Sequence, residues 1–401
     1  MGNQLLRQRS GRGATGWPAV TLIGAAFAIT MLGTTLPTPL YPLYEKAFGF
    51  GELVTTVVFA AYAVGVTAAL LVFGHWSDQL GRRPMLQAGL ALSGLSAFVF
   101  LLAGGLGWLF VGRVVSGLSA GIFTGTATAT IVDLAPESGK KRASLIAAAV
   151  NMGGLGAGPL LAGILAQYAP LPLTLCFIVD LVLVVAAVGA VQLVAEPVRR
   201  ARTLRLRPQK IDVPMEIRGV FTRAAIAGFA GFAVLGLFTA VSPAFLATVL
   251  HHTNHALTGA VVISVFIAST IGQSLSSLIG EQRALIVGCV GLIAGMVLVA
   301  ASLPLHSLAV LIVGGIIAGL GQGLSFRAGL GAVTSAAPSD KRGEITSSYF
   351  VMLYIGISIP VIGEGAAATA LGLVTAGMVF AALVAILAAV ALVLLVRSAS
   401  H

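Results

Sequence analysis

Long apolar stretches, separated by short polar segments, follow one another along the whole chain of 401 residues. Most are close to the length of about 20 helical residues that crosses the hydrocarbon core of a bilayer. A sustained alternation of apolar and polar residues, typical of strands in a membrane β-barrel, is not found in the sequence. The pattern therefore predicts an all-α membrane protein with twelve transmembrane helices. We place them at residues 17–40, 53–75, 85–105, 107–133, 143–167, 171–194, 224–250, 257–280, 284–304, 306–334, 345–369 and 372–396.

A polar segment in the middle of the sequence divides the predicted helices into two sets of six. It covers residues 196–223, so that we expect an N-terminal half at 1–195 and a C-terminal half at 224–401. The halves share sequence features, because GRVVSGLSAG at 112–121 corresponds to GGIIAGLGQG at 314–323. Parallel repeats of this kind are typical of transporters whose substrate site lies between the repeats. We therefore predict two six-helix pseudo-repeats joined by a central loop.

The composition and the distribution of charge agree with a membrane location. Apolar residues make up 58% of the chain and charged residues 9%, and the mean hydropathy is +1.02. A soluble domain carries about 25% charged residues. The basic residues gather in the N-terminal tail, the even-numbered loops and the C-terminal end, and Lys46 is the one that falls in an odd-numbered loop. By the positive-inside rule we expect both termini in the cytoplasm of a multi-pass plasma-membrane protein, in a bacterium the inner membrane.

The basic central loop is expected to contact anionic lipid headgroups. No aromatic residues are interleaved with its charges, so that a nucleic-acid partner is not expected. The basic residues of this loop are Arg199, Arg200, Arg202, Arg205, Arg207 and Lys210.

Motifs of other protein classes are missing from the sequence. There is no P-loop, and the G-x-G-x-x-G pattern at 11–16 lies in a basic tail without a preceding strand, so that a nucleotide site is not expected. Cys176 and Cys289 lie inside predicted helices and are expected to be packing residues. We expect no enzymatic activity, no cofactor and no bound metal.

The polar segment between the second and third predicted helices has a distinctive pattern, GHWSDQLGRRP from residue 74. Gly74 and Gly81 allow sharp backbone turns. Asp78 can meet the N-terminal end of a facing helix or a basic side chain. Arg82 and Arg83 would hold the loop at the cytoplasmic headgroups. The spacing G-x-x-x-D-x-x-G-R-R between two apolar stretches resembles the signature loop of the major facilitator superfamily.

This resemblance implies the twelve-helix fold of that family, in which the loop acts as a latch between the two halves. For Asp78 we expect a partner at the start of the helix at 345–369. Asp133 closes the fourth predicted helix at the same membrane face, so that Asp78, Arg82, Asp133 and Arg142 can form a charge network at a cytoplasmic gate. The alternative for Asp133 is a helix-end acid in contact with water.

Arg113 lies within the fourth predicted helix, where a charge costs about 3 kcal/mol unless it is paired or hydrated. Gly117, Gly121 and Gly125 follow at four-residue spacing and predict a surface for close helix packing. An arginine followed by this glycine row resembles the second signature of the proton-coupled drug antiporters of the superfamily, in which the arginine is linked to proton coupling. The alternative is that Arg113 extends toward the outer headgroups.

The fifth predicted helix contains a second run of glycines that leads into a proline. Its key residues are Gly154, Gly158, Pro159 and Gly163. The run resembles the antiporter signature of the same group, which the family ties to export. The alternative is a kinked and tightly packed helix without a role in direction.

Asp180 and Glu364 are the only acids well inside predicted helices. A carboxyl group in a low-dielectric site can take up and release protons. We therefore expect one of the two to be the coupling carboxylate. Glu364 is preferred because the eleventh helix of this family lines the cavity, whereas Asp180 is expected to be a structural partner. A structural role is the equally weighted alternative for Glu364.

Polar residues in other predicted helices are candidates for the wall of a substrate cavity. The first predicted helix contains no acid, although many related exporters keep one there for cation recognition, and this argues against a cationic substrate. The alternative for each candidate is a hydrogen bond between helices. The candidates are Asn151, Gln273, Gln322, Arg327 and Tyr354.

Together these features predict a monomeric secondary active transporter similar to the twelve-helix drug/proton antiporters. We expect proton-coupled export of a small, apolar organic compound by alternating access, with substrate, protons and membrane lipid as partners. Proton-coupled uptake and the efflux of a sugar or metabolite are the alternatives within transport. The alternative from another class is a non-transporting receptor or scaffold, which would tolerate the loss of Asp78 and Arg113.

Overall fold

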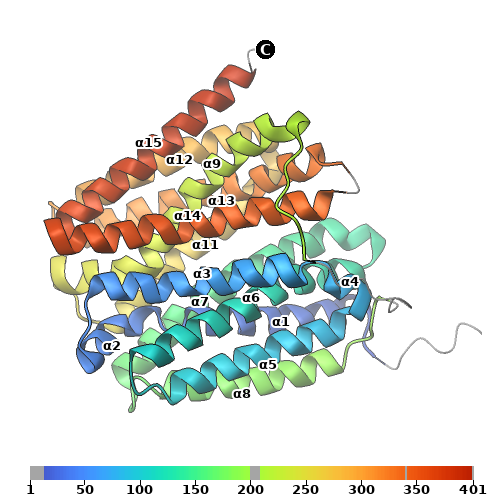
Figure 1. Cartoon of the computed structure of the whole chain (residues 1–401), viewed down its shortest axis with the longest axis horizontal. Helices are drawn as coiled ribbons and strands as arrows, with labels where there is room; N and C mark the ends of the chain where they lie inside the picture. Colours follow the sequence, from blue (N-terminus) through green and yellow to red (C-terminus); the bar gives the residue numbers. More distant parts are fainter. Residues whose placement is uncertain (1–12, 199–207, 339–340, 400–401) are drawn as a thin grey trace, which may run out of the picture.

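The structure of the chain, a computed structural model, describes residues 13–198, 208–338 and 341–399. Its long helices lie side by side along the long axis of the molecule, and the two halves of the sequence form two adjacent groups (Figure 1). In the described residues, 12 helical segments are long and apolar enough to cross a membrane, so that the predicted number is confirmed. The central-loop residues Arg199, Arg200, Arg202, Arg205 and Arg207 lie outside the described residues.

The first half contains α1 (Gly16–Thr35), α2 (Tyr41–Phe48), α3 (Glu52–Phe73), α4 (Trp76–Leu80), α5 (Arg82–Leu101), α6 (Leu106–Leu134), α7 (Lys140–Tyr168) and α8 (Leu175–Gln192). The second half contains α9 (Arg218–Gly236), α10 (Ser242–Ala244), α11 (His255–Ile279), α12 (Glu281–Ser302), α13 (Leu308–Ala336), α14 (Arg342–Leu371) and α15 (Leu373–Ala399). We call the end of the bundle that carries α4 the α4 end, and the opposite end, which carries α2, the α2 end (Figure 1).

Two of the transmembrane segments are less regular than expected. The first helix ends at Thr35 and is followed by a 3-10 turn and by α2, because Pro37 and Pro39 lack the N–H groups that would continue the helix. The seventh segment contains two π-helical stretches, Leu237–Val241 and Phe245–Val249, on either side of α10. All residues of the 3-10 turn and of the first π-helical stretch are buried. Irregular backbone is tolerated at membrane depth where protein surrounds it.

Glycines set close helix contacts at equivalent places in the two halves. Gly65 of α3 faces Gly117 of α6, and a Cβ atom on either residue would overlap the backbone of the other helix. Gly272 of α11 and Gly323 of α13 stand in the same relation in the second half. Small residues let helix backbones approach closely in membranes, where dispersion contacts drive association. The pseudo-repeat seen in the sequence therefore corresponds to the same helix contact made twice.

The glycine row of α6 does not lie against α3 along its whole length. Gly117 and Gly121 both contact α3, whereas a Cβ atom at Gly125 would meet no atom within 4 Å. Four residues turn a helix by about 40° more than one full turn, so that the row moves away from α3. The predicted packing surface is therefore confirmed for the first two glycines and is wrong for Gly125, which lines a cavity instead.

The two halves meet closely toward the α2 end. There α7 packs against α11, and α3 packs against α14. Gly163 of α7 lies against the backbone of His255, and Gly365 of α14 lies against Thr56. These contacts join the halves where α7 and α14 end and where α3 and α11 begin.

The carboxylate of Glu196, just beyond α8, holds the start of α5 at the α4 end. It accepts hydrogen bonds from the backbone N–H groups of Arg82 (2.8 Å) and Arg83 (2.9 Å). Gly81 before them has a φ of +101°, and a Cβ atom there would lie 2.9 Å from Oε2 of Glu196. A negative charge is favoured at a helix N-terminus, where the first N–H groups lack helical partners. The sequence did not indicate this role, because the partners are 114 residues apart.

Replacing Glu196 by Ala removes the acceptor for both N–H groups at the start of α5. We expect the free energy of unfolding to fall by about 1–3 kcal/mol, the usual cost of unsatisfied polar groups, and the midpoint of thermal unfolding of the detergent-solubilised protein to fall with it. Glu137→Ala is the matched control, since the side chain of Glu137 is 87% exposed and pairs with Lys140 at the surface. Equal midpoints for the two variants would contradict the capping role.

Gly117→Leu is expected to force α3 and α6 apart. Overpacking of this kind costs about 1–3 kcal/mol, and more where backbone is the obstacle, so that thermal stability and the yield of monodisperse protein should both fall. Gly125→Leu places the same side chain two turns later in the same helix, in open space. It should fold like the wild type in size-exclusion chromatography. If both variants lost stability and yield to a similar extent, the α3–α6 contact would not be the reason that position 117 requires glycine.

Candidate substrate cavity and gate

A cavity of about 920 Å³ lies between the two halves and extends to the α4 end. Its walls come from α3, α6 and α7 of the first half and from α11, α13 and α14 of the second half. Gly74, Asp133 and Arg342 line it at the α4 end, whereas Asn151 and Gln273 line it at greater depth. Sites for small organic ligands have volumes of about 300–1,000 Å³. The cavity is therefore large enough for a drug-sized molecule.

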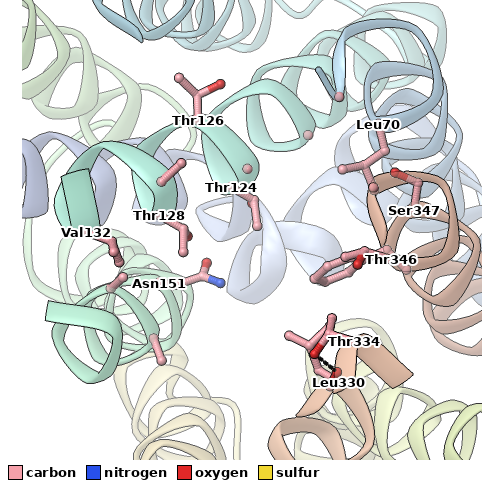
Figure 2. A pocket seen from close by; sticks show the side chains of 18 of the residues that line it. Leu70, Thr124, Thr126, Thr128, Val132, Asn151, Leu330, Thr334, Thr346 and Ser347 are labelled. Atoms are coloured by element: carbon pink, nitrogen blue, oxygen red, sulfur yellow. Dashed lines mark hydrogen bonds between the residues drawn. The ribbon is translucent and has the colours of Figure 1, made fainter. Parts of the chain in front are cut away.

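The wall of this large cavity is mainly apolar, with hydroxyl and amide groups distributed over it. In Figure 2, Asn151 and Thr128 lie on one side of the space and Thr334 on the other. Of the residues predicted for a substrate cavity, Asn151, Gln273 and Arg327 lie on this wall. Its apolar part includes Leu70, Phe73, Ile122, Val132, Phe326, Leu330 and Phe350. Its hydroxyl groups belong to Thr124, Thr126, Thr128, Ser144, Thr334, Thr346 and Ser347.

A smaller cavity of about 50 Å³ lies deeper, toward the α2 end. It shares Asn151 and Phe326 with the large cavity and is also lined by Tyr354, another of the predicted residues. Tyr354 of α14 contacts Tyr62 of α3 edge to face, with ring centroids 6.3 Å apart. Aromatic rings from both halves therefore form a layer below the large cavity.

Gln322, the remaining predicted cavity residue, lies on the wall of neither cavity. Its side chain is fully buried, and its Oε1 accepts a hydrogen bond of 2.5 Å from the hydroxyl of Ser269 in α11. Gln273 donates to the same hydroxyl at 3.3 Å. For Gln322 the structure therefore shows the alternative, a hydrogen bond between helices.

Arg113 lies in the protein interior and is 2% exposed, so that the alternative of extension toward headgroups is wrong. Its guanidinium donates to the backbone carbonyls of Thr34 (2.5 Å) and Phe59 (3.5 Å), and it lies 4.8 Å from the ring centroid of Tyr62. Among the described residues, no carboxylate forms an ion pair with it. The guanidinium also lies 5.3 Å from the ring centroid of Phe59. The carbonyl end of α1 and the rings of Phe59 and Tyr62 therefore stabilise this charge.

Arg327 of α13 lies half-buried on the wall of the large cavity. Its guanidinium donates a hydrogen bond of 3.1 Å to the hydroxyl of Ser144 in α7. This bond crosses the space from the second half to the first. In the part of the chain that the structure describes, the ion pairs do not include Arg327.

Arg82 is the centre of a charge cluster beside the mouth of the large cavity. Its guanidinium pairs with Asp78 at 2.7 Å and with Asp133 at 3.1 Å, and it donates to the hydroxyl of Ser77 at 2.7 Å. The side chain of Arg82 is 11% exposed, so that these bonds form in a partly dry site. The cluster joins the loop after α3 to the end of α6.

Two expectations for this cluster are wrong. Arg142 does not join it but lies over the ring of Trp17 at 5.0 Å, because α7 begins beside α1 and its first turn faces that helix. The ion pair of Asp78 is with Arg82 and not with the start of α14, because Arg82 lies one helical turn away in the same loop and meets the carboxylate at 2.7 Å. The side chain of Asp78 is 61% exposed.

Gln209 of the central segment connects the two halves at the mouth, a role that the sequence did not indicate. Its backbone N–H donates to the carbonyl of Leu71 in α3 at 2.7 Å, and its side-chain Oε1 accepts from the hydroxyl of Ser347 in α14. A Cβ atom at Gly74 would lie 2.9 Å from this Oε1. The predicted loop glycine therefore leaves room for a residue of the central segment.

The glycines of the predicted antiporter signature in α7 face two neighbouring helices. Gly154 and Gly158 lie against the backbone of α1, and Gly163 lies against the start of α11. The signature therefore packs α7 against both its own half and the other half.

Pro159 of the signature frees a carbonyl that another helix then satisfies. A proline lacks the N–H group that would bond to the carbonyl four residues earlier, here that of Leu155. The hydroxyl of Thr35, the last residue of α1, donates to this carbonyl at 2.8 Å. The proline position of α7 is thereby tied to the point where α1 ends.

The two buried acids lie away from both cavities. Asp180 of α8 is 1% exposed and faces Gly33 of α1, so that it is enclosed within the first half. Glu364 of α14 is 3% exposed and lies next to Gly365, which contacts α3 of the first half. Each has one carboxylate oxygen without a hydrogen-bond partner among the described residues. Glu364 is thus the acid at the contact between the halves.

Comparisons with known proteins agree with this architecture. The family described as the Major Facilitator Superfamily matches residues 23–361. The puromycin resistance protein pur8 of Streptomyces alboniger is 28% identical over 204 residues, which cover 51% of this chain and 39% of that protein. The quinolone resistance protein NorA of Staphylococcus aureus is 29% identical over 140 residues, which cover 35% of this chain and 36% of that protein. The chain thus matches less than half of the length of these relatives.

A solved structure has a similar fold over nearly the whole chain. The human organic anion transporter MFSD10 superposes with a TM-score of 0.69 and 16% identity, covering 94% of this chain and 99% of that one. At this identity the likeness concerns the fold alone. The family match, by contrast, spans most of the sequence and includes the loop signature and the glycine motifs. The chain therefore belongs to the major facilitator superfamily, a family of multi-pass membrane transporters and not of enzymes.

Proposed function

We propose that the protein exports small organic compounds in exchange for protons, by alternating access to the large cavity. The observation that carries this proposal is that the cavity reaches the α4 end and that the halves pack together toward the α2 end. A site between two repeats that is accessible from one side is one state of a rocking cycle. Export then requires a second state in which the α2 end is open.

The distribution of charge supports an orientation with the α4 end in the cytoplasm. Arg82, Arg142, Arg342 and Arg397 all lie near the α4 ends of their helices, whereas Lys46 lies at the α2 end. Basic residues are enriched on the cytoplasmic side of membrane proteins. The structure would then be the inward-open state in a plasma membrane, with both termini cytoplasmic.

The cluster around Arg82 would serve as the cytoplasmic gate. Arg82 holds the loop against α6, and the carboxylate of Asp78, although paired with Arg82, is 61% exposed to solvent. When the α4 end closes, Asp78 can approach the start of α14, whose free N–H groups and dipole favour an anion. The link through Gln209 and Ser347 would guide this approach.

Proton coupling is assigned to Arg113 and Glu364. Arg113 borders the small cavity below the substrate space, and its charge is held by carbonyls of α1 and α3 that belong to one half. Glu364 lies where α14 meets α3, a contact that must separate when the α2 end opens. A carboxyl group that is buried in one state and hydrated in the other can take up and release a proton in step with the cycle. Asp180 stays inside one half in both states.

The names of the relatives support export but leave the substrate open. One is named for puromycin resistance and one for quinolone resistance. The two glycine motifs that resemble the antiporter signatures are present in α6 and α7. Export of a drug-like compound is therefore the function that we test first.

The first experiment follows proton movement in energised everted vesicles with a pH-sensitive dye and a panel of drugs, sugars and metabolites. We expect a substrate to collapse the gradient in the wild type, and Arg113→Ala to reduce this signal at least tenfold. Arg283→Ala is the control, because Arg283 is exposed in the first turn of α12 and lines neither cavity. If no compound moves protons, uptake, uniport or a role without transport replaces the proposal.

The second experiment separates coupling from substrate exchange for the two buried acids. Glu364→Gln should lose gradient-driven export at least tenfold and keep substrate counterflow, because exchange without net proton movement needs no titrating group. Asp180→Asn should keep both activities. Unchanged gradient-driven export in Glu364→Gln would remove Glu364 from the coupling mechanism, and the reverse pattern would assign coupling to Asp180.

A further inference from the structure

Positive charges outnumber negative charges around the large cavity. In the described part of the chain, its wall carries three of them, Arg327, Arg342 and Asp133. A third arginine, Arg113, borders the small cavity directly below. The balance of charge around the substrate space is therefore positive.

Asp133, the single acid that the described residues place on the wall, is already paired. Asp133 lies at the mouth, where its carboxylate pairs with Arg82 at 3.1 Å, and Arg82 itself does not line the cavity. Asp133 is thus held by a partner outside the cavity. Because Arg82 also pairs with Asp78, the cluster keeps one net negative charge, and this charge lies at the mouth of the cavity.

Arg327 is the charged group best placed to meet a ligand. It is half-buried, and its guanidinium donates to the neutral hydroxyl of Ser144, which is easily exchanged for a stronger acceptor. The wall that carries Arg327 also carries apolar side chains, among them Phe326 and Leu330. A charge in apolar surroundings gains more from an opposite charge than it does in water. A guanidinium also matches the two oxygens of a carboxylate or sulfonate.

The remaining wall indicates what the rest of the ligand is like. Aromatic and aliphatic side chains from both halves line the same cavity as Arg327, and hydroxyl and amide groups are scattered among them. Such a surface binds an apolar body with a few polar atoms. An inorganic anion or a highly hydroxylated sugar would leave most of this wall without a matching partner.

We propose that the substrate of this cavity is an organic anion, with an apolar body and a carboxylate or sulfonate that Arg327 binds. This inference rests on the proposed transport function, since it names the substrate class for the same cavity. It adds a charged group to the small, apolar organic compound that the sequence predicts. A bound anion would lie between Arg327 of the second half and Ser144 of the first half. The affinity for the anion would therefore depend on how the two halves are positioned relative to each other.

The test measures binding to the purified full-length protein in nanodiscs, with no proton gradient and no flux. The probes are matched sets on several aromatic and aliphatic bodies, each as the carboxylate, the sulfonate, the neutral amide and the amine. Thermal stabilisation finds the binding bodies, and titration gives their affinities. We expect acids to bind at least tenfold more tightly than their amides, equivalent to about 1.4 kcal/mol, and amines to bind most weakly.

Variants at one position then identify the group responsible. Arg327→Gln should lower the affinity for the acids at least tenfold and leave the affinity for the amides nearly unchanged, whereas Arg327→Lys should retain part of the preference for acids. Arg283→Gln removes the same charge outside the cavity and should bind like the wild type. If Arg327→Gln fails to fold, the comparison between Arg327→Lys and the wild type still measures the contribution of the guanidinium.

Each outcome separates this inference from the transport proposal. Acids and amides that bind equally, tighter binding of amines, or an absence of binding by every acid would overturn the anion inference while leaving transport open. Preference for acids that is unchanged in both Arg327 variants would remove Arg327 from the site. Selective binding of acids without any flux in vesicles would support the inference and contradict the proposed transport.

Discussion

The constraint on which this structure depends is that polar groups in the hydrocarbon core must find partners within the protein. Helices satisfy their own backbone, so that irregular backbone is confined to buried places. In the segment Met215–Val249, which contains the π-helical stretches, the apolar stretch of 18 residues is 89% buried, a larger share than in the corresponding stretch of any other span found in the described chain. The carbonyl freed by Pro159 is satisfied by Thr35 from another helix. The same rule places Arg113 against two backbone carbonyls instead of lipid.

Close packing through glycines joins helices within each half and also joins the two halves toward the α2 end. Within each half, glycine contacts join α3 to α6 and α11 to α13 through backbone, where little side-chain rearrangement is possible. Between the halves, contact is concentrated toward the α2 end, and the α4 end carries a cavity of about 920 Å³. A bundle built in this way can exchange which end is closed by moving two bodies, each of which keeps its own contacts. The buried acid Glu364 lies at the contact that such a movement would break.

Sequence reasoning identified residues whose chemistry is unusual for their position. Arg82 and Asp133 do form an ion pair, and Arg327 lies on the cavity wall. A charge in or beside an apolar helix needs either an opposite charge or a water-accessible space, and this limits where it can lie. It failed where the partner comes from a distant part of the chain. Glu196 caps α5 across 114 residues, and Gln209 bonds to Ser347 across 138 residues. Neither residue belongs to a periodic pattern or a motif that would have marked it.

Local stretches of sequence determined three features of this protein: the number of membrane spans, the asymmetry of charge and the family signature in the loop after α3. Each is recognised from residues within about 20 positions of one another. The residues that line the cavity, and the charge on its wall, cannot be recognised from local sequence. These helices are apolar on nearly every side, because lipid and protein interior are similarly apolar, and so no periodicity tells which face a helix turns to its neighbours. That Arg327 faces a cavity while Gln322, five residues earlier in the same helix, is buried behind it follows from how the helices pack.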